Sequence, residues 1–273
     1  MAGKINEKKL AKAYNQALAL EKAGDFAAAA EAYRAVLALD PDDHGGAAVR
    51  LAAIGHGEAP LKAPDAYVET LFDQHADDFE DILVEQLGYC VPMIVRQRFQ
   101  SLELGGFKRM LDLGCGTGLA GTALRDMADD ITGLDLSENM VSIAYDKEVY
   151  DTLFVAEVVD FLQENEEEAF DLVVAADVLP YLGALEPIFA GAAANMQKGG
   201  TFAFSAETLP DDALKGRGYT VGPHHRFGHS LAYISNALAE AGFETLEVTD
   251  INVRFEDGQP TPGYLVIARY APS

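Results

Sequence analysis

Three glycines alternate with other residues in the segment DLGCGTG, which runs from Asp112 to Gly118. An apolar run precedes this segment and a helix-forming run follows it, so the segment is predicted to form the turn between a strand and a helix. Because glycine has no Cβ, a ligand can lie against this backbone, and amides at the start of the helix can donate to a carboxylate or phosphate. A dinucleotide fingerprint would need glycine in the sixth position from Gly114, where Leu119 stands, which argues against a dehydrogenase.

A second candidate binding residue is Asp135, which ends the next apolar run 19 positions after Gly116. In nucleotide-binding folds an acid about 20 residues further on accepts hydrogen bonds from a ribose. A carboxylate suits this role because it can accept from both hydroxyls at once. Asp135 could also cap the helix that begins near Ser137, and the two roles are compatible.

Three of the six histidines, His224, His225 and His229, stand within six residues of one another. Neutral histidine suits general-base work near neutral pH, and His229 is the first candidate because it begins a helical pattern close to Arg226. Two alternatives remain: His229 binds only backbone at the helix start, or the trio holds a metal ion. No acid lies at ligand spacing, so we expect no metal site.

Other side chains near this segment give conflicting indications of what the ligand is. Arg226 could bind a carboxylate-bearing substrate through two hydrogen bonds, or it could pair with one of the many acids. Tyr181, Tyr219 and Tyr233 could line a site for an amine. These alternatives stay open.

The elements that must position these residues alternate along most of the chain. From residue 108 onward, short β-branched runs are followed by longer helical patterns, as in KRMLDL and GLAGTALRDMA. This alternation predicts an α/β fold with a doubly wound, mostly parallel sheet. Ligands of such sheets bind at the carboxyl ends of the strands, where the glycine segment and Asp135 stand.

The first part of the chain has a different pattern, which predicts a helical hairpin over residues 10–41. Its small and aromatic residues fall at the spacing of one tetratricopeptide repeat of 34 residues; they are Ala17, Gly24, Phe26, Ala29, Tyr33 and Pro41. A second repeat is cut short, and such a fragment cannot bury its own apolar face. We therefore expect the hairpin to dock on the main domain or on a second copy of the chain. The predicted boundaries are 1–57 for the helical segment, 58–66 for a linker and 67–273 for the main domain.

Composition limits the classes of partner. The 273 residues are 49% hydrophobic, with a net charge of −24, and no stripe of Lys and Arg offsets that charge. Such a surface repels a phosphate backbone, so we expect a small molecule rather than a nucleic acid. No apolar run is long enough to span a membrane, so a cytoplasmic protein with no membrane partner is expected. The two cysteines, Cys90 and Cys115, are expected to be reduced.

The glycine segment resembles the first motif of class I S-adenosylmethionine-dependent methyltransferases, an apolar strand followed by Asp-x-Gly-x-Gly-x-Gly. The resemblance extends from about residue 67 to the end and implies a seven-stranded Rossmann-like sheet with helices on both faces. It also implies a set of cofactor-binding residues: Asp112, Gly114, Gly116, Gly118, Asp135, Leu136, Met140, Glu157, Val158 and Asp177. In such enzymes the acid at Glu157 accepts from the adenine amino group, while Leu136 and Val158 face the ring from its two sides.

More narrowly, the chain resembles predicted methyltransferases that carry an N-terminal tetratricopeptide segment. In the wider class, helices ahead of the first strand close over the cofactor, which makes Tyr67, Phe72, His75 and Phe79 candidate lid residues. Their spacing fits an ordinary packed helix face equally well. Tyr181, His225 and Arg226 are candidates for the substrate side, and His229 and Asp177 for catalysis.

The resemblance implies methyl transfer from S-adenosyl-L-methionine to an oxygen or nitrogen of a small molecule, with release of S-adenosyl-L-homocysteine. The main task of such a site is to hold the acceptor in line with the sulfonium and to keep water out. Two alternatives remain open. The protein could be a cofactor-binding adaptor whose helical hairpin recruits a partner, or a protein methyltransferase. The N-terminal helices could pair two copies of the chain or dock a partner, although we expect the hairpin groove to be occupied.

Overall fold

The computed structural model describes residues 7–166 and 168–272, and over these residues the chain forms a seven-stranded sheet in the order β3-β2-β1-β4-β5-β9-β8. The first five strands are parallel, and β9 runs antiparallel to both of its neighbours. This topology confirms the predicted fold class. The strands are β1 (Phe107–Leu113), β2 (Ala128–Asp135), β3 (Thr152–Val155), β4 (Phe170–Ala175), β5 (Met196–Glu207), β8 (Phe243–Glu256) and β9 (Gln259–Tyr270).

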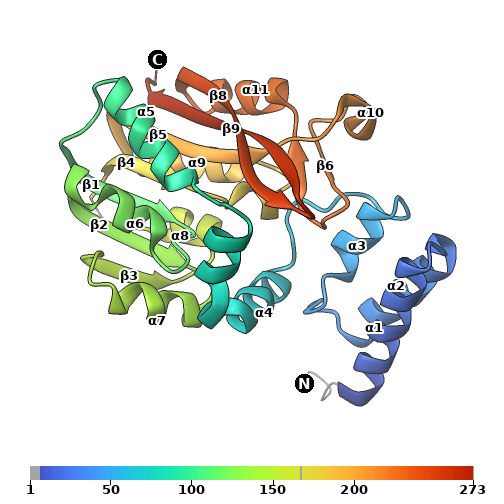
Figure 1. Ribbon diagram of the computed structural model, residues 1–273. Helices are drawn as coiled ribbons and strands as arrows, with labels where there is room; N and C mark the ends of the chain where they lie inside the picture. Colours follow the sequence, from blue (N-terminus) through green and yellow to red (C-terminus); the bar gives the residue numbers. More distant parts are fainter. Residues whose placement is uncertain (1–6, 167, 273) are drawn as a thin grey trace.

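Helices cover both faces of the sheet, because the central strands are apolar on both sides (Figure 1). On one face, α5 (Val91–Ser101) and α6 (Leu119–Leu124) pack against a cluster that includes Met110 and Ile131. On the other face lie α8 (Val158–Glu164), α9 (Glu186–Ala194) and α11 (Leu231–Glu240), packed around Phe202 and Phe204. The remaining helix between strands, α7 (Glu138–Asp146), joins β2 to β3. Short turns of 3-10 helix, η3 (Arg125–Met127) and η4 (Leu179–Tyr181), precede β2 and follow β4, and α10 (Asp211–Leu214) follows β5.

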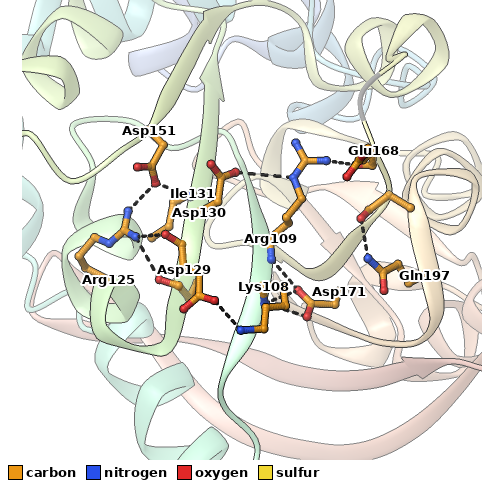
Figure 2. Close-up of polar contacts among 12 residues, drawn as sticks. Lys108, Arg109, Arg125, Asp129, Asp130, Ile131, Asp151, Glu168, Asp171 and Gln197 are labelled. Atoms are coloured by element: carbon orange, nitrogen blue, oxygen red, sulfur yellow. Dashed lines mark hydrogen bonds and ion pairs between the residues drawn. The ribbon is translucent and has the colours of Figure 1, made fainter.

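Ion pairs tie together the amino ends of the central strands, at the edge of the sheet away from their carboxyl ends (Figure 2). The Asp171 carboxylate accepts from the backbone amides of Lys108 and Arg109, at 2.8 and 2.9 Å, and so links β4 to β1. Arg125 donates to Asp151 at 2.7 Å and links the turn before β2 to the start of β3. These contacts fix the register of strands whose opposite ends carry the glycine turn and Asp135.

The N-terminal segment is a helical hairpin followed by one short helix, as predicted. Helices α1 (Glu7–Lys22) and α2 (Phe26–Leu39) pack through small residues, and α3 (Ala47–Ala53) covers the same apolar cluster. Asp25 caps α2, since its side chain accepts from the Ala28 amide at 3.1 Å. The inner face of the hairpin is therefore occupied by α3 of the same chain.

Through α3 the helical segment docks on the main domain (Figure 1), one of the two expected arrangements. Val49 of α3 is fully buried against Val221 and Phe227, which belong to the hairpin of β6 (Tyr219–Val221) and β7 (Phe227–His229). A polar contact lies beside this apolar one. His225 Nε2 is 3.1 Å from a carboxylate oxygen of Glu21 in α1 and 3.2 Å from the Arg50 guanidinium in α3.

Residues 58–66, predicted to be a linker, are held on the domain instead of crossing open solvent. The Ala63 amide donates to the Tyr181 carbonyl at 2.8 Å, and the Gly183 amide donates to the Leu61 carbonyl at 2.8 Å. Lys62 thereby pairs with Leu182 as an isolated bridge. The predicted linker is thus paired with the loop after β4 through the backbone of residues 61–63, which we call the strap.

After this strap the chain forms α4 (Asp65–His75), a turn of 3-10 helix, η1 (Ala76–Asp78), and a π-helical turn, η2 (Asp81–Gln86), before it reaches α5. Asp73 accepts from the Ser137 hydroxyl in the turn after β2. Glu80 accepts from the Thr117 hydroxyl in the turn after β1, at 2.6 Å, and pairs with Lys147. These contacts place α4, η1 and η2 over the carboxyl ends of the central strands.

Candidate functional site

A cavity of about 930 Å³, its open mouth included, lies at the carboxyl ends of the parallel strands. It lies where ligands of a doubly wound sheet bind. Residues that follow β1, β2, β3 and β4 contribute to its wall, and the strap, α4, η2 and α5 close it from the other side. Eleven of the predicted site residues line it: Asp112, Gly114, Gly116, Asp135, Leu136, Glu157, Val158, Asp177, Phe72, Phe79 and Tyr181.

The glycine turn has the conformation that its sequence predicts. Gly114 and Gly116 have φ values of 63° and 53°, in the left-handed region that favours glycine. A Cβ on Gly114 would stand 2.6 Å from a methyl group of Val178. Gly118 has a φ of 93° and begins α6, but it faces Tyr150 rather than the cavity. Gly114 and Gly116 therefore leave their backbone open to a ligand, while Gly118 allows close packing behind the turn.

Asp135 joins the turns after β1 and β2. One carboxylate oxygen accepts from the Gly116 amide at 2.9 Å, and the other accepts from the Ser137 amide at 2.9 Å. Ser137 itself caps α7, because its side chain accepts from the Met140 amide. The cap of α7 is thus Ser137 and not Asp135. Met140 is fully buried behind this turn and does not line the cavity, contrary to its expected place beside a cofactor.

Asp112 is the most deeply buried carboxyl group of the cavity wall. It is 1% exposed, and the Tyr150 hydroxyl donates to it at 2.7 Å. Burial raises the pKa of Asp112 to about 7, and the nearby Asp135 carboxylate acts in the same direction, while the Tyr150 hydrogen bond opposes them. Near neutral pH this carboxyl group exchanges its proton, so the charge of the cavity depends on pH.

Glu157 begins α8 and serves as its cap. One of its carboxylate oxygens accepts from the Val159 and Asp160 amides, at 2.7 and 2.8 Å. The other lies 3.4 Å from the Lys62 ammonium of the strap, which also contacts Asp65 at 2.8 Å. Lys62, Asp65 and Ala63 are wall residues that sequence reasoning missed, because they stand in a segment whose prolines and glycines are typical of a linker.

Two of the four candidate lid residues line the cavity. The Phe72 ring centroid lies 5.9 Å from that of Phe79 and 5.3 Å from that of Tyr181, both edge to face, and Phe79 lies over Gly116. Tyr67 packs instead on Gly46 at the junction with the helical segment. His75 is exposed at the end of α4 and does not line the cavity. The lid candidates that line the cavity are therefore Phe72 of α4 and Phe79, which follows η1, and not Tyr67 or His75.

Asp177 follows β4 with a φ of 66°, and its amide donates to the Ser205 hydroxyl at 2.9 Å. One of its carboxylate oxygens accepts from Arg254 of β8 at 2.8 Å. Burial raises the pKa of Asp177 to about 6, although the Arg254 guanidinium lowers it. Arg254 is 5% exposed and also contacts Glu207 at 2.9 Å. The sequence analysis did not identify Arg254 as a site residue, although an arginine within the apolar strand pattern INVRF could have indicated it.

The structure does not bring His229 to the cavity. The ring is fully buried in β7, and its Nε2 lies 2.9 Å from the Leu182 carbonyl and 3.2 Å from the Gly183 carbonyl. Burial lowers the pKa of His229 to about 4, so the ring is neutral and carries its hydrogen on Nε2. The alternative of a histidine that binds only backbone is the arrangement found, and a role as general base in this cavity is not compatible with it.

Arg226 and His225 also lie outside the cavity wall. Arg226 donates to Glu207 at 2.7 Å and pairs with Glu256, so the alternative of pairing with acids is the one found. His225 serves the junction with the helical segment. A metal site was not expected, and within residues 7–166 and 168–272 no group of three or more His, Cys, Asp or Glu side chains is arranged to hold a metal ion. In the same part of the chain, no helix has the length and apolarity needed to cross a bilayer.

Comparisons with known proteins show a methyltransferase domain match in the central part of the chain. Residues 111–204, from β1 into β5, match the family model described as a methyltransferase domain. Over 113 residues the chain is 32% identical to a ubiquinone biosynthesis O-methyltransferase of Hydrogenovibrio crunogenus, which covers 40% of this chain and 45% of that protein. A ubiquinone biosynthesis O-methyltransferase of Coxiella burnetii is 26% identical over 117 residues, with 42% and 49% covered. The chain thus spans about half the length of these curated relatives.

Two solved structures have the same fold at low sequence identity. The N-methyltransferase NodS of Bradyrhizobium japonicum, in complex with S-adenosyl-L-homocysteine, is 16% identical, with a TM-score of 0.51 over 65% of this chain and 85% of that one. An S-adenosylmethionine-dependent methyltransferase of Methanosarcina mazei is 14% identical, with a TM-score of 0.51 over 64% and 98%. The chain therefore carries a methyltransferase domain match over residues 111–204, which contain the glycine turn and the strands beside it, and it shares the fold of S-adenosylmethionine-dependent methyltransferases.

Proposed function

We propose that the protein transfers a methyl group from S-adenosyl-L-methionine to a small-molecule acceptor and releases S-adenosyl-L-homocysteine. The observation that carries this proposal is the arrangement of Asp135 across the open glycine turn, inside a cavity that a separate set of helices closes. The match of residues 111–204 to the methyltransferase domain supports it.

The cavity residues fit the parts of this cofactor in order along the sheet. The open backbone at Gly114 and Gly116 would hold the amino-acid part, and Asp135 would accept from the ribose hydroxyls. Its two oxygens already accept backbone amides, but each keeps a second lone pair for a hydroxyl. Glu157, Leu136 and Val158 would hold the adenine. The bound cofactor would supply an electrophilic methyl group on a positively charged sulfur.

The chain's own residues would then orient the acceptor and exclude water. Phe72 and Phe79 lie over the glycine turn, and the contacts of Asp73 and Glu80 with the turns after β2 and β1 hold them there. Displacement at a methyl group needs the accepting atom in line with the sulfur, so an enclosed wall of fixed rings favours the reaction by positioning.

Two observations favour a small acceptor over a protein: α4 and η2 lie over the cavity, and the inner face of the helical hairpin is covered by α3. The net charge of −24 opposes binding to nucleic acid. The curated relatives named above are ubiquinone biosynthesis O-methyltransferases, and this name supports a small-molecule acceptor for this chain.

The test is to incubate the protein with methyl-deuterated S-adenosylmethionine and a bacterial metabolite extract, and to follow the label by mass spectrometry into small molecules and proteins. A labelled small molecule that is absent with the Asp135→Ala variant would support the proposal. Label in proteins alone would overturn the small-molecule assignment. Cofactor binding by calorimetry, with no labelled product from extracts of several sources, would favour the cofactor-binding adaptor instead.

A further inference from the structure

One end of the cavity is not needed for the cofactor. The residues that would hold the cofactor follow β1, β2 and β3, whereas the cavity continues past them to the end of β4. From β3 to β4 the sheet spans three strand spacings, or about 14 Å. We call the part beyond β1 the acceptor end. Asp177, Val178 and Tyr181, which follow β4, belong to its wall, together with Phe72, which packs on Tyr181, and Tyr89, which lies near Asp177.

Most of this wall is apolar or aromatic, but the hydroxyl groups of Tyr89 and Tyr181 in it make no hydrogen bond to the described residues. Tyr89 is 5% exposed and stands where η2 ends, since its amide donates to the Leu83 carbonyl at 3.0 Å. Its hydroxyl is not among the fully enclosed polar atoms that lack a partner, so it keeps contact with the cavity. A hydroxyl that the protein leaves unpaired in a cavity wall can donate to a ligand or accept from one.

A carboxylate oxygen faces the same space. Arg254 holds one oxygen of Asp177, and the other makes no hydrogen bond to the part of the chain that is described. Burial raises the pKa of Tyr89 well above its ordinary value. The Asp177 carboxylate adds to this rise and the Arg254 guanidinium opposes it, which requires that the hydroxyl lies near this ion pair. The pKa of Tyr181 is raised by burial, lowered by the Arg254 guanidinium and raised by the Asp177 carboxylate.

Hydrogen bonding decides what kind of acceptor fits beside Asp177. The charged groups that act on Asp177 are Arg254, Glu207, Arg226 and Glu256. Arg254 holds the Asp177 carboxylate at 2.8 Å and is shared with Glu207, so the acceptor end offers a carboxylate oxygen and a hydroxyl in an apolar wall. A hydroxyl both donates and accepts. It could donate to the free oxygen of Asp177 while it accepts from Tyr89, whereas an ammonium can only donate.

Building on the function proposed above, we propose that the acceptor is a neutral, flat, apolar molecule that is methylated on a hydroxyl oxygen, which Tyr89 and Asp177 hold. In this step the acceptor O–H bond breaks and its proton passes to the Asp177 carboxylate. A new bond forms between that oxygen and the methyl carbon, while the S–CH₃ bond breaks and the sulfur keeps the electron pair. The products are a methyl ether and the neutral thioether, and the proton on Asp177 returns to solvent when the lid opens.

The experiment compares two variants of the full chain with a matched control. Tyr89→Phe removes only the unpartnered hydroxyl, Asp177→Asn keeps an oxygen for Arg254, and Tyr145→Phe removes the same atom from a side chain that is 73% exposed on α7. The acceptor is the labelled product's precursor, identified from the metabolite extract, or the paired probes 2-naphthol and 2-(aminomethyl)naphthalene, the second of which is an ammonium at neutral pH. Cofactor affinity and the unfolding temperature are measured for each variant.

We expect the label on oxygen and turnover of 2-naphthol but not of 2-(aminomethyl)naphthalene. Tyr89→Phe should raise the acceptor KM five- to tenfold with unchanged cofactor affinity and no fall in unfolding temperature. Asp177→Asn should lower kcat by 100-fold or more, since it removes the proton acceptor. Tyr145→Phe should behave as the unchanged protein.

The outcomes separate this inference from the function on which it rests. Methyl transfer to nitrogen, or an unchanged acceptor KM in Tyr89→Phe, would overturn the hydroxyl assignment and leave methyl transfer intact. The absence of transfer to any acceptor in the extract would remove both. A fall in unfolding temperature with Tyr89→Phe would assign the hydroxyl to folding instead of binding.

Discussion

Two carboxyl groups in the cavity, those of Asp112 and Asp177, lose their protons in the pH range where the protein would work. Burial raises their pKa values to about 7 and about 6. Neither has a basic partner that fully compensates its burial: Tyr150 is the only side chain that donates to Asp112 within the described residues, and Arg254 is shared with Glu207. A bound sulfonium would favour the ionised form of both groups, so cofactor binding should release protons.

The burial of Asp112 predicts a specific dependence of stability on pH. Because the folded pKa lies above the unfolded value of about 3.9, ionisation is less favourable in the folded protein. Ionisation of Asp112 therefore lowers the free energy of unfolding. This loss grows as pH rises from about 4 to about 7 and is constant above that. From pH 5 to pH 8 the free energy of unfolding should fall by on the order of 2 kcal/mol because of this group.

The variant Asp112→Asn removes this ionisation while keeping an oxygen for the Tyr150 hydroxyl. Unfolding temperatures of the protein without cofactor should be measured at pH 5, 6, 7 and 8. As pH rises, the unfolding temperature of the variant should increase relative to that of the unchanged protein. Parallel curves across this range would contradict the raised pKa.

At the scale of single residues, the sequence predicted those side chains whose position depends on neighbours along the chain. Asp112 and Asp135 stand at the carboxyl ends of β1 and β2, and Glu157 follows β3, so the strands carry all three to the cavity. His229 was misassigned because its partners, the carbonyls of Leu182 and Gly183, are more than 40 positions away. Contacts of that kind leave no pattern within a short segment.

The turn between β1 and α6 shows how one element depends on residues elsewhere. Gly114 needs both its left-handed φ of 63° and the space that Val178, in the turn after β4, takes up. The sequence predicts the first requirement from the glycine spacing. The second requirement arises because β4 lies beside β1 in the sheet, although β2 and β3 come between them in the sequence.

Gly114→Ala tests this turn against a matched variant. An added Cβ would stand 2.6 Å from Val178, so either the turn or the loop after β4 must shift, and both line the cavity. We expect cofactor affinity to fall at least tenfold. In Gly199→Ala the φ of 87° imposes a similar strain of about 1 kcal/mol, but nothing lies within 4 Å of the new Cβ. That variant should lose stability and keep its cofactor affinity, as measured by calorimetry; equal losses of affinity in both would refute the explanation.

At the scale of the whole molecule, the helical segment is an extension of the wall around the cavity. Its α3 packs on the β6–β7 hairpin, and the chain then continues directly into the strap, where Lys62 lines the cavity. The sequence predicted that the hairpin would be covered, from the apolar face it cannot bury alone. It could not predict the strap, because the backbone hydrogen bonds of residues 61–63 do not depend on side-chain type.

This continuity predicts that undocking the segment weakens ligand binding at a distance. Val49 is fully buried between α3 and the β6–β7 hairpin, so Val49→Asp places a charge in an apolar cluster and should destabilise the docked arrangement by several kcal/mol, about 3 or more. Limited proteolysis should then cut the chain between α3 and α4, which the unchanged protein should resist. Cofactor affinity should fall as well, because the strap that carries Lys62 is released.

The matched control is Val248→Asp, which introduces the same charge at a side chain of β8 that is 37% exposed. It should leave both the cleavage pattern and the cofactor affinity as they are in the unchanged protein. If Val49→Asp opens the chain to protease yet binds the cofactor normally, the strap keeps its place without the helices, since the pairing of Ala63 with Tyr181 would then be sufficient to hold it. A fall in affinity that accompanies the cleavage would mean that α3, through its hold on the β6–β7 hairpin, helps to keep the cavity closed.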